Sequence, residues 1–438
     1  MVDRINFGKL VDIAEPPDLI EIQINSYEDF LQLDVPPMKR KTIGLQAAFK
    51  EVFPIQSFDG RFELDFVKYE FSQPKKGPLK SLKDGETFAA PLNVTFRLKN
   101  GEEVCEENVY MGEIPIMTES GSFVVNGAER VVVSQLHRSP GISFERTTPA
   151  SGAHLYSFRL IPDHGSWVEV QQDANSIIHI YLDRQHRRRK FLASTFLRAL
   201  GYSTDEELFR IVYTMEEPLL DTLKDLKDEE LARFALKEDV IDADSKSLLA
   251  KQYDRLTRKL LKQLQTINVA KLPLVNISWD DGIFLENVRK DKTHATDDAL
   301  RELFKILRPG DPPTPANARQ MLKSLFFDPK RFDLGRVGRY KINQKLGLPK
   351  TKDFRALDND DIISALKYLI QLSRNHGTID DIDHLGSRRL RTVGELVENQ
   401  CRMGLARTQK TLRDKLVFLD AEREKITPQR LINPKSLS

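Results

Sequence analysis

The segment QLHRSPG, residues 135–141, places hydrogen-bonding side chains where a predicted strand runs into a turn. Gln135, His137 and Arg138 precede a Pro-Gly pair. Amide, imidazole and guanidinium groups in such a position can contact phosphate oxygens or base edges. The same residue types also serve as capping and turn groups at strand ends. The segment by itself therefore leaves both interpretations open, a nucleic-acid contact and turn chemistry.

A second candidate is the run RQHRRRK, residues 184–190, which is unusually rich in cations. Clustered Lys and Arg side chains bind a phosphate backbone by releasing its counterions. The alternative is a solvated surface that leads into a helix expected from residue 191 onward. The density of charge favours phosphate contacts. The cations are Arg184, Arg187, Arg188, Arg189 and Lys190.

A third stretch, DDIDHLGSRRLR at 380–391, joins acidic residues and a histidine to a basic run. Carboxylates and imidazole are ligands of Mg²⁺ or Zn²⁺, so a metal site is one interpretation. The arginines that follow would repel a cation and can pair with the carboxylates. An aspartate can instead accept hydrogen bonds from guanine while an arginine holds the phosphate or the base. The stretch therefore favours nucleic acid over a metal ion.

Trp167, in the segment DHGSWVEVQ, has two interpretations. Tryptophan after a glycine at a strand start is more often a core residue, but it can also form a platform on which an unstacked base lies. The sequence contains no Gly-rich phosphate loop, no GxSxG elbow and no zinc-ligand spacing. Taken together, the residues favour a scaffold that handles nucleic acid over an independent enzyme.

The composition is that of a globular protein with two or more domains. The 438 residues are 40% hydrophobic, and 67 Lys and Arg against 65 Asp and Glu leave a net charge of +2. Any basic function must therefore come from local clusters. No apolar run approaches the roughly 18 residues of a membrane span, and the N-terminus has no signal-peptide pattern. Two cysteines, Cys105 and Cys401, predict no disulfide framework, and a reducing cytoplasm is expected.

Strands are expected to dominate up to about residue 140. Alternation of apolar and polar residues at 62–71 predicts a half-buried strand. Asn-Gly turns at 100–101 and 126–127 predict two hairpins. Ser26 is expected to cap a helical turn that follows it directly.

Helices are expected to dominate after residue 190. The expectation rests on apolar residues at helical spacing and on capping signatures at the helix starts. The predicted features are a helix at 191–200 that ends at Gly201, a capping box from Ser203 to Glu206, a mostly helical stretch at 217–268, a helix start at Thr314 and Pro315, and helices at 358–375 and 391–419.

Six collinear stretches, which span nearly the whole chain, resemble the N-terminal part of the bacterial RNA polymerase β subunit. One such stretch would be suggestive, and six in order make accidental similarity very improbable. They are PPDLIEIQINSYEDFLQ, GEIPIMTESGSFVVNGAERVVVSQLHRSPG, IPDHGSWVEV, RPGDPPT, LFFDPKRFDLGRVGRYKIN and DDIDHLGSRRLRTVGELVENQCRMGL.

The resemblance implies a mixed α+β fold, in which a strand-rich protrusion domain is interrupted by a more helical lobe domain. The protrusion would comprise residues 1–137 and a return segment at 392–438, and the lobe at 138–391 would be inserted between them. In the family this part forms one wall of the DNA channel and contacts the non-template strand.

The resemblance also implies roles for individual residues. The positions that match the family's pocket for a guanine of the non-template strand are Arg138, Trp167, Asp183, Ile382, Asp383 and Arg388. The positions that match the edge of the rifamycin pocket are Arg130, Val133 and Gln135. The run at 184–190 is longer than the family's usual basic turn, so its cations stay candidates for DNA phosphate contacts or for a solvated surface.

For activity, the resemblance implies part of a DNA-directed RNA polymerase, a nucleotidyltransferase of the bacterial cytoplasm. The chain ends before the family's catalytic residues and most of its rifamycin pocket, so it would neither catalyse alone nor bind the drug tightly. It would hold no metal or other cofactor, because Mg²⁺ is expected in the partner β′ subunit. The expected partners are the remainder of β, the β′, α and sigma subunits, and double- and single-stranded DNA, with no membrane. The alternatives are a free-standing DNA-binding module derived from β and, in third place, a metal-dependent hydrolase.

Overall fold

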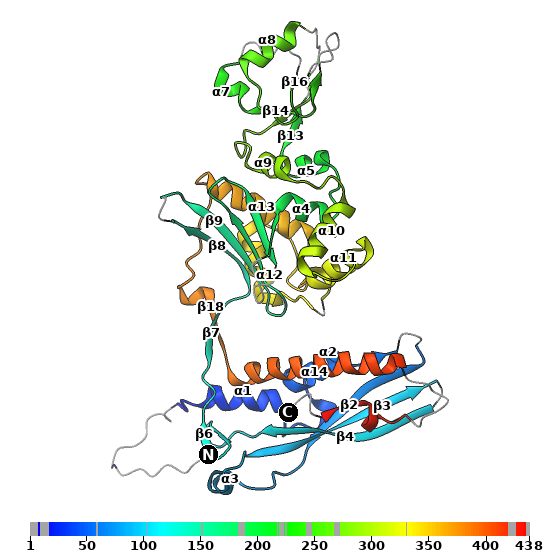
Figure 1. The fold of residues 1–438 in the computed structure, drawn as a ribbon. Coiled ribbons are helices and arrows are strands. Elements are labelled where there is room, and N and C mark those ends of the chain that lie inside the picture. Colours follow the sequence, from blue (N-terminus) through cyan, green and yellow to red (C-terminus); the bar gives the residue numbers. More distant parts are fainter. Residues whose placement is uncertain are drawn as a thin grey trace. The chain divides into compact units, whose positions relative to one another are not determined.

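The computed structural model describes most of the chain and divides it into two compact units. The first unit comprises Met1–His137 and Leu390–Ser438, and the inserted unit comprises Arg138–Arg389 (Figure 1). The predicted mixed α and β fold class is confirmed. The described residues are 8, 17–57, 60–101, 103–149, 152–182, 189–216, 218, 223, 226–241, 248–266, 272–329, 331–418 and 426–434.

The first unit is built on an antiparallel sheet of order β1-β2-β3-β4. The predicted strand at 62–71 and both predicted Asn-Gly hairpins are confirmed. Asn126 and Gly127 have φ values of 50° and 72°, the left-handed pair that a tight two-residue hairpin requires. The elements are α1 (Glu21–Leu31), η1 (Pro37–Lys39), α2 (Gly44–Val52), β1 (Ile55–Gln56), β2 (Phe62–Phe71), α3 (Pro78–Asp84), β3 (Ala89–Asn100), β4 (Glu103–Pro115), β5 (Phe123–Val125), β6 (Ala128–Arg130), α14 (Val393–Phe418) and α15 (Pro428–Leu431).

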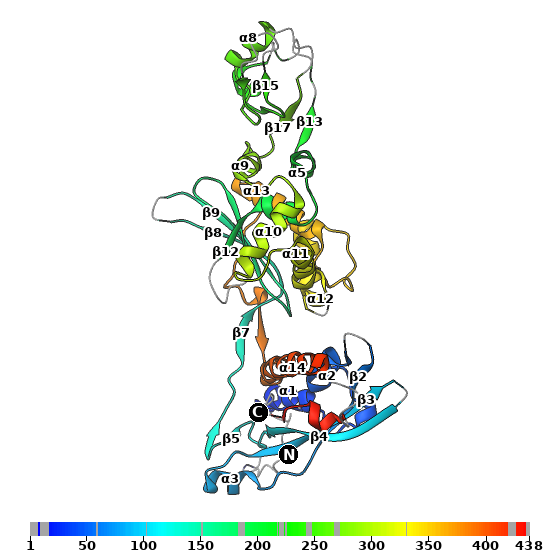
Figure 2. The same cartoon turned by 45° about the vertical axis from the view of Figure 1, so that its right-hand side comes forward.

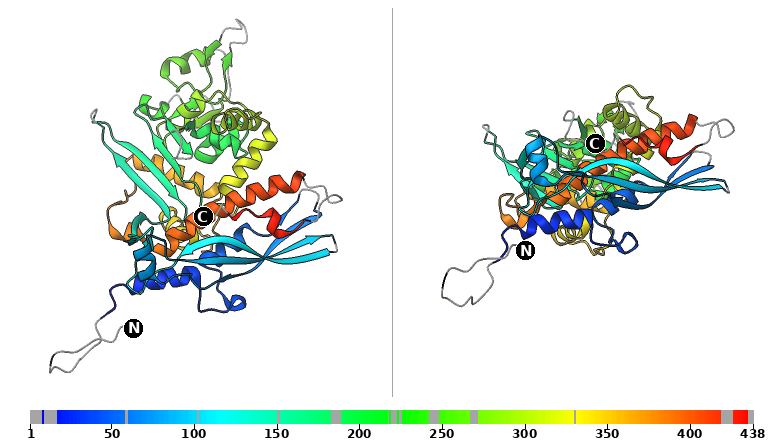
Figure 3. Two further views of the ribbon diagram at one scale, coloured as in Figure 1. Left: turned by 60° about the horizontal axis from the view of Figure 1, so that its bottom comes forward. Right: turned by 90° about the horizontal axis from the view of Figure 1, so that it is seen from below.

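Helices α1, α2 and α14 pack along the sheet of the first unit and close its core (Figures 1 and 3). Phe49 of α2 stacks on Phe66 of β2 with ring centroids 4.8 Å apart, and Phe96 of β3 meets Phe49 edge-on. The long β3–β4 hairpin contributes apolar side chains at alternate positions, because successive residues of a strand point to opposite faces.

Ser26 does not start a helix, so that prediction was wrong. The helix α1 begins five residues earlier, at Glu21, and Ser26 lies inside it. Its Oγ accepts a hydrogen bond of 3.0 Å from the backbone N–H of Gly394, in the first turn of α14. Ser26 therefore satisfies an N-terminal N–H group of a different helix, which local sequence patterns do not reveal.

The inserted unit contains a twisted antiparallel sheet of order β12-β11-β10-β9-β8, with helices packed on one face (Figure 2). The elements are β8 (Gly141–Thr147), β9 (Leu155–Ile161), β10 (Val168–Gln172), β11 (Ile178–Leu182), β12 (Arg189–Leu192), α4 (Ala193–Ala199), α5 (Asp205–Val212), β13 (Thr214–Glu216), α7 (Asp228–Leu231), β14 (Phe234–Leu236), β15 (Val240–Ile241), β16 (Leu248–Ala250), α8 (Arg258–Thr266), β17 (Leu274–Asn276), α9 (Ile283–Lys290), α10 (Thr296–Leu307), α11 (Pro315–Leu322), η2 (Lys323–Phe327), α12 (Gly335–Leu346), α13 (Asn359–Ser373) and η3 (Leu385–Ser387).

Local capping signatures locate several of these helices. Thr314 caps α11 with Pro315 in its first turn, as predicted, and the predicted helices that became α13 and α14 are confirmed. The capping box of α5 is Thr204 with Glu207, one residue later than predicted. The helix expected at 191–200 begins only at Ala193, because residues 189–192 pair with β11 as strand β12.

The prediction that 217–268 is mostly helical was wrong for the described residues of this stretch, which form short strands as well as helices α7 and α8. This part has a separate small core of leucines, and β13, β17 and β14 form a sheet there. Leucines mixed with Lys, Asp and Glu occur both in amphipathic helices and in half-buried strands, and only the period of the apolar residues separates the two, so composition alone misled the prediction.

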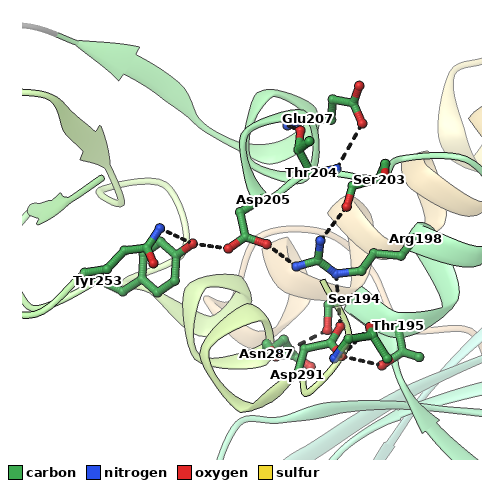
Figure 4. A network of polar contacts seen from close by, with 12 residues as sticks. Ser194, Thr195, Arg198, Ser203, Thr204, Asp205, Glu207, Tyr253, Asn287 and Asp291 are labelled. Carbon is green, nitrogen blue, oxygen red and sulfur yellow. Dashed lines mark hydrogen bonds and ion pairs between the residues drawn. The ribbon is translucent and has the colours of Figure 1, made fainter. Parts of the chain in front are cut away.

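A buried polar network joins this leucine-rich part to the helices of the inserted unit (Figure 4). The guanidinium of Arg198, only 1% exposed, pairs with Asp205 and Asp291 and donates to the Ser203 carbonyl at 2.6 Å. Asp205 also accepts a hydrogen bond from the Tyr253 hydroxyl. The Tyr253 pKa is raised by burial and by this contact with Asp205, so the phenol stays protonated and donates.

Among the described helices, none is both long enough and apolar enough to cross a bilayer.

Candidate nucleic-acid interface

Strand β18 (Arg388–Arg391) and strand β7 (Gln135–Arg138) pair with each other, and the chain passes between its two units along them. Three of the residues predicted to form the guanine pocket lie in or next to the loop before β18 and contact one another. They are Ile382, Asp383 and Arg388. Arg388 forms an ion pair with Asp383 and donates through Nε to the Ile382 carbonyl at 3.1 Å. The Asp383 side chain is 88% exposed, whereas that of Arg388 is 31% exposed. The loop thus presents an oriented carboxylate to solvent.

The other polar residues of DDIDH are occupied within the fold. Asp381 Oδ1 accepts from the backbone N–H of Asp383 at 2.9 Å, and His384 Nδ1 accepts from that of Gly386 at 3.0 Å. Asp380 bonds to the backbone of β8. Within the residues that the structure describes, no three His, Cys, Asp or Glu side chains group as metal ligands would.

Arg138 lies at the end of β7 and belongs to a chain of ion pairs. Its Nη1 lies 2.6 Å from Oε1 of Glu145, which also accepts from Arg159 at 3.2 Å. Arg159 in turn pairs with Glu169 at 3.3 Å. The three partners come from β8, β9 and β10 and lie on the sheet face opposite the apolar core. This face therefore holds Arg138 in one orientation.

Trp167 is half-buried and directly precedes β10. The loop that carries it is tied to β18, because Asp163 Oδ1 accepts from Arg389 Nη2 at 2.9 Å. Neighbouring residues on a strand point to opposite faces. Arg388 accordingly pairs with Asp383, while Arg389 pairs with Asp163 in the loop that carries Trp167. One short strand thus contacts both the loop of Asp383 and the loop of Trp167.

The second candidate run is only partly described. Asp183, Arg184, Arg187 and Arg188 lie outside the described residues. Arg189 donates from Nη1 to the carbonyl of Leu307, the last residue of α10, which favours a role in capping that helix. Lys190 is exposed on β12.

The residues predicted at the edge of a rifamycin pocket lie in the first unit. Arg130 ends β6, where it pairs with Phe123, and Gln135 begins β7. Both are exposed, and Val133 between them is 77% exposed.

Sequence reasoning missed Glu145, Arg159 and Glu169, which orient Arg138. A signal was present for Arg159 and Glu169, because each alternates with buried neighbours along its strand, as in Phe158-Arg159-Leu160. Charged residues at such positions on adjacent strands lie close enough to pair. The arrangement as a whole offers an exposed carboxylate, oriented guanidinium groups and a half-buried indole. Such groups can accept from a base edge, hold phosphate and stack on a base.

Comparisons with known proteins agree on one family. Residues 279–391 match the family described as RNA polymerase Rpb2, domain 2. The chain is 50% identical, over 100% of its length, to the DNA-directed RNA polymerase subunit beta of Methylacidiphilum infernorum, of which it covers 35%. It is 44% identical over 99% of its length to the proteins of that name from Protochlamydia amoebophila and Chlamydia muridarum, again covering 35% of each. The chain thus spans about a third of the length of these curated relatives.

Proposed function

The chain belongs to the family of bacterial DNA-directed RNA polymerase β subunits, and we propose that it forms the part of such a subunit that lines the DNA channel and contacts the non-template strand during RNA synthesis. The first unit would be the protrusion and the inserted unit the lobe. Its partners would be the remainder of β, the β′, α and sigma subunits, and DNA, in the bacterial cytoplasm. Catalysis and the catalytic Mg²⁺ would reside in the other parts of that assembly.

The observation that carries the proposal is the Arg388–Asp383 pair on its exposed loop. Guanine presents two adjacent N–H donors on its Watson–Crick edge, and a carboxylate is an acceptor with two oxygens. Arg388 fixes the carboxylate before the base arrives, so little conformational entropy is lost on binding. The other bases lack this pair of donors and would leave the carboxylate poorly satisfied, which is how a polar site discriminates.

The test compares wild type with Asp383→Ala and Arg388→Ala in a reconstituted polymerase that contains the complete β subunit. The ligands are two bubble DNAs that differ only by guanine or thymine at one non-template position. We expect the ratio of the two affinities to fall about tenfold, since a good base contact discriminates by about 1–3 kcal/mol. Overall affinity should change little, because phosphate contacts dominate it.

Asp360→Ala is the matched control, because it removes another exposed carboxylate of the inserted unit. It should leave the guanine-to-thymine ratio unchanged. An equal loss of affinity for both DNAs in Asp383→Ala would contradict base recognition. Failure of the chain to assemble with the other subunits, together with salt-dependent DNA binding by the chain alone, would instead favour a free-standing DNA-binding module.

A further inference from the structure

Two lysines, one turn apart on α12, reach the loop that carries Asp383 and Arg388. Lys341 Nζ donates to the carbonyl of Gly386 at 3.1 Å. Lys345 Nζ donates to the carbonyl of Thr378 at 2.9 Å and pairs with Asp380 Oδ1 at 2.7 Å. The two ammonium groups thus bind the loop on both sides of Asp383.

The helix α12 is itself held firmly. A Cβ atom on Gly338 would lie 3.1 Å from Cβ of Pro140 and 3.3 Å from the nitrogen of Gly141, so the helix backbone lies directly on the start of β8. On the buried side, Arg339 forms a bidentate ion pair with Asp361 of α13, at 2.8 and 3.0 Å. Because α12 is anchored to both neighbours, its lysines are attached to a rigid support.

Strand β8 and Ser139, which precedes it, fasten the same loop from a second direction. Asp380 donates its backbone N–H to the Phe144 carbonyl at 3.0 Å, and its Oδ2 accepts from the Phe144 N–H at 2.8 Å. Ser139 donates its N–H to the Ser387 carbonyl at 3.0 Å. Lys345 adds to the attachment of Asp380 to Phe144, because it pairs with the Asp380 carboxylate. Lys341 adds to the attachment of Ser387 to Ser139, because it binds the carbonyl of the preceding residue, Gly386.

We infer that Lys341 and Lys345 are positioning residues, which hold the loop 378–388 so that Asp383 and Arg388 keep the geometry that recognises guanine. The inference rests on the proposed function and extends it from the residues that contact the base to those that orient them. Lys341 acts through a backbone carbonyl, so its effect does not depend on the identity of the loop side chain it meets.

The charge of Lys341 is tied to the loop as well. Burial lowers the Lys341 pKa, and the nearby Asp380 carboxylate opposes that shift. The ammonium form is thus supported by the loop acid that Lys345 also binds. Arginine at either position keeps the charge and a donor of similar reach, whereas methionine keeps only the apolar stem.

The experiment uses the reconstituted polymerase and the two bubble DNAs described above. We expect Lys341→Met to lower the guanine-to-thymine affinity ratio about three- to tenfold, which corresponds to a loss of about 0.7–1.4 kcal/mol of base discrimination. Lys341→Arg should stay within about twofold of wild type. Lys345→Met combined with Asp380→Asn, which leaves no carboxylate without its counter-charge, should lower the ratio similarly. Thermal unfolding of each assembled variant checks that the fold is retained.

Lys323→Met is the control for loss of charge, because Lys323 is exposed on η2 and belongs neither to α12 nor to the loop. Asp383→Ala is the reference for the proposed function. If Asp383→Ala abolishes the preference and Lys341→Met leaves it intact, the positioning inference is wrong while the guanine site stands. If Asp383→Ala has no effect, the proposed function itself fails. If Lys341→Met weakens both DNAs equally, Lys341 contacts phosphate instead and the inference is overturned.

Discussion

At the scale of single residues, the sequence indicated which charged residues form the candidate interface, but it did not indicate most of the partners that those residues contact. Asp383 and Arg388 are five positions apart, and an acid next to a basic run indicated the pairing that the structure contains. Glu145 and Lys341 gave no such local signal, because each meets its partner through the tertiary fold. The roles of all the site residues in binding DNA stay predictions.

Cys401 offers a test of burial in the first unit. It is 8% exposed, and burial, with a contribution from Glu398, raises its pKa to about 12. At pH 8 only roughly one molecule in ten thousand would carry the reactive thiolate there. We expect iodoacetamide at pH 8 to alkylate the half-buried Cys105 while Cys401 stays unmodified, as peptide mass spectrometry would measure.

Raising the pH toward 12 should increase the thiolate fraction of Cys401 and its alkylation with it. Denaturation in urea should expose both cysteines and make their modification rates similar. Rapid modification of Cys401 in the native protein at pH 8 would mean that α14 is not packed as described.

At the scale of elements, prediction succeeded where a signal and its partner are close in sequence. Thr314 caps its own helix through the N–H of Asn317, three residues away. Ser26 meets the N–H of Gly394, 368 positions away, and was therefore assigned to the wrong helix. The leucine-rich part failed for a related reason, because its strands pair with segments distant in the chain.

The contact between α1 and α14 can be tested by substitution. A Cβ atom on Gly394 would lie 2.1 Å from the Ser26 carbonyl oxygen, so Gly394→Ala must push the helices apart. We expect it to lower the free energy of unfolding by about 3 kcal/mol or more, measured by urea denaturation. Ser26→Ala should cost about 1 kcal/mol, although alanine is the better helix former inside α1.

Gly77→Ala is the control, because a Cβ atom there would meet nothing within 4 Å. Gly77 caps α3, so a cost below about 1 kcal/mol is expected. Equal effects of the two glycine substitutions would contradict the close helix crossing.

The Arg198 network makes a second prediction at this scale. Arg198→Met would leave Asp291, which is 1% exposed, without its counter-charge. We expect a loss of about 3–5 kcal/mol in the free energy of unfolding. Tyr253→Phe removes one hydrogen bond from Asp205 and should cost about 1 kcal/mol. Arg210→Met, which breaks an exposed pair with Glu206, should change stability by less than about 0.5 kcal/mol.

At the scale of the whole molecule, the resemblance anticipated a mixed fold, and length anticipated more than one domain. Each unit has its own apolar core, one in the first unit and another under the sheet of the inserted unit. The assignment of the first unit to the protrusion and of the inserted unit to the lobe belongs to the proposed function.

The separate core makes a prediction about the inserted unit. Residues 138–389 expressed alone should retain the core under their sheet and unfold it cooperatively in urea, as tryptophan fluorescence would measure. Both tryptophans, Trp167 and Trp279, lie in this unit and report on it. A gradual, non-cooperative change would show that the unit needs the rest of the chain to fold.

The position of α14 in the chain has a consequence for synthesis on the ribosome. This helix supplies Val393, Cys401 and Leu405 to the core of the first unit, yet it follows the whole inserted unit in sequence. At about 5–20 residues per second, translation of residues 138–389 takes roughly 13 to 50 s. During that interval the nascent sheet of β1–β4 lacks the helix that covers it. The core of the first unit therefore cannot be completed until the inserted unit has been translated, and chaperones that shield apolar surface would act on the first unit in that interval.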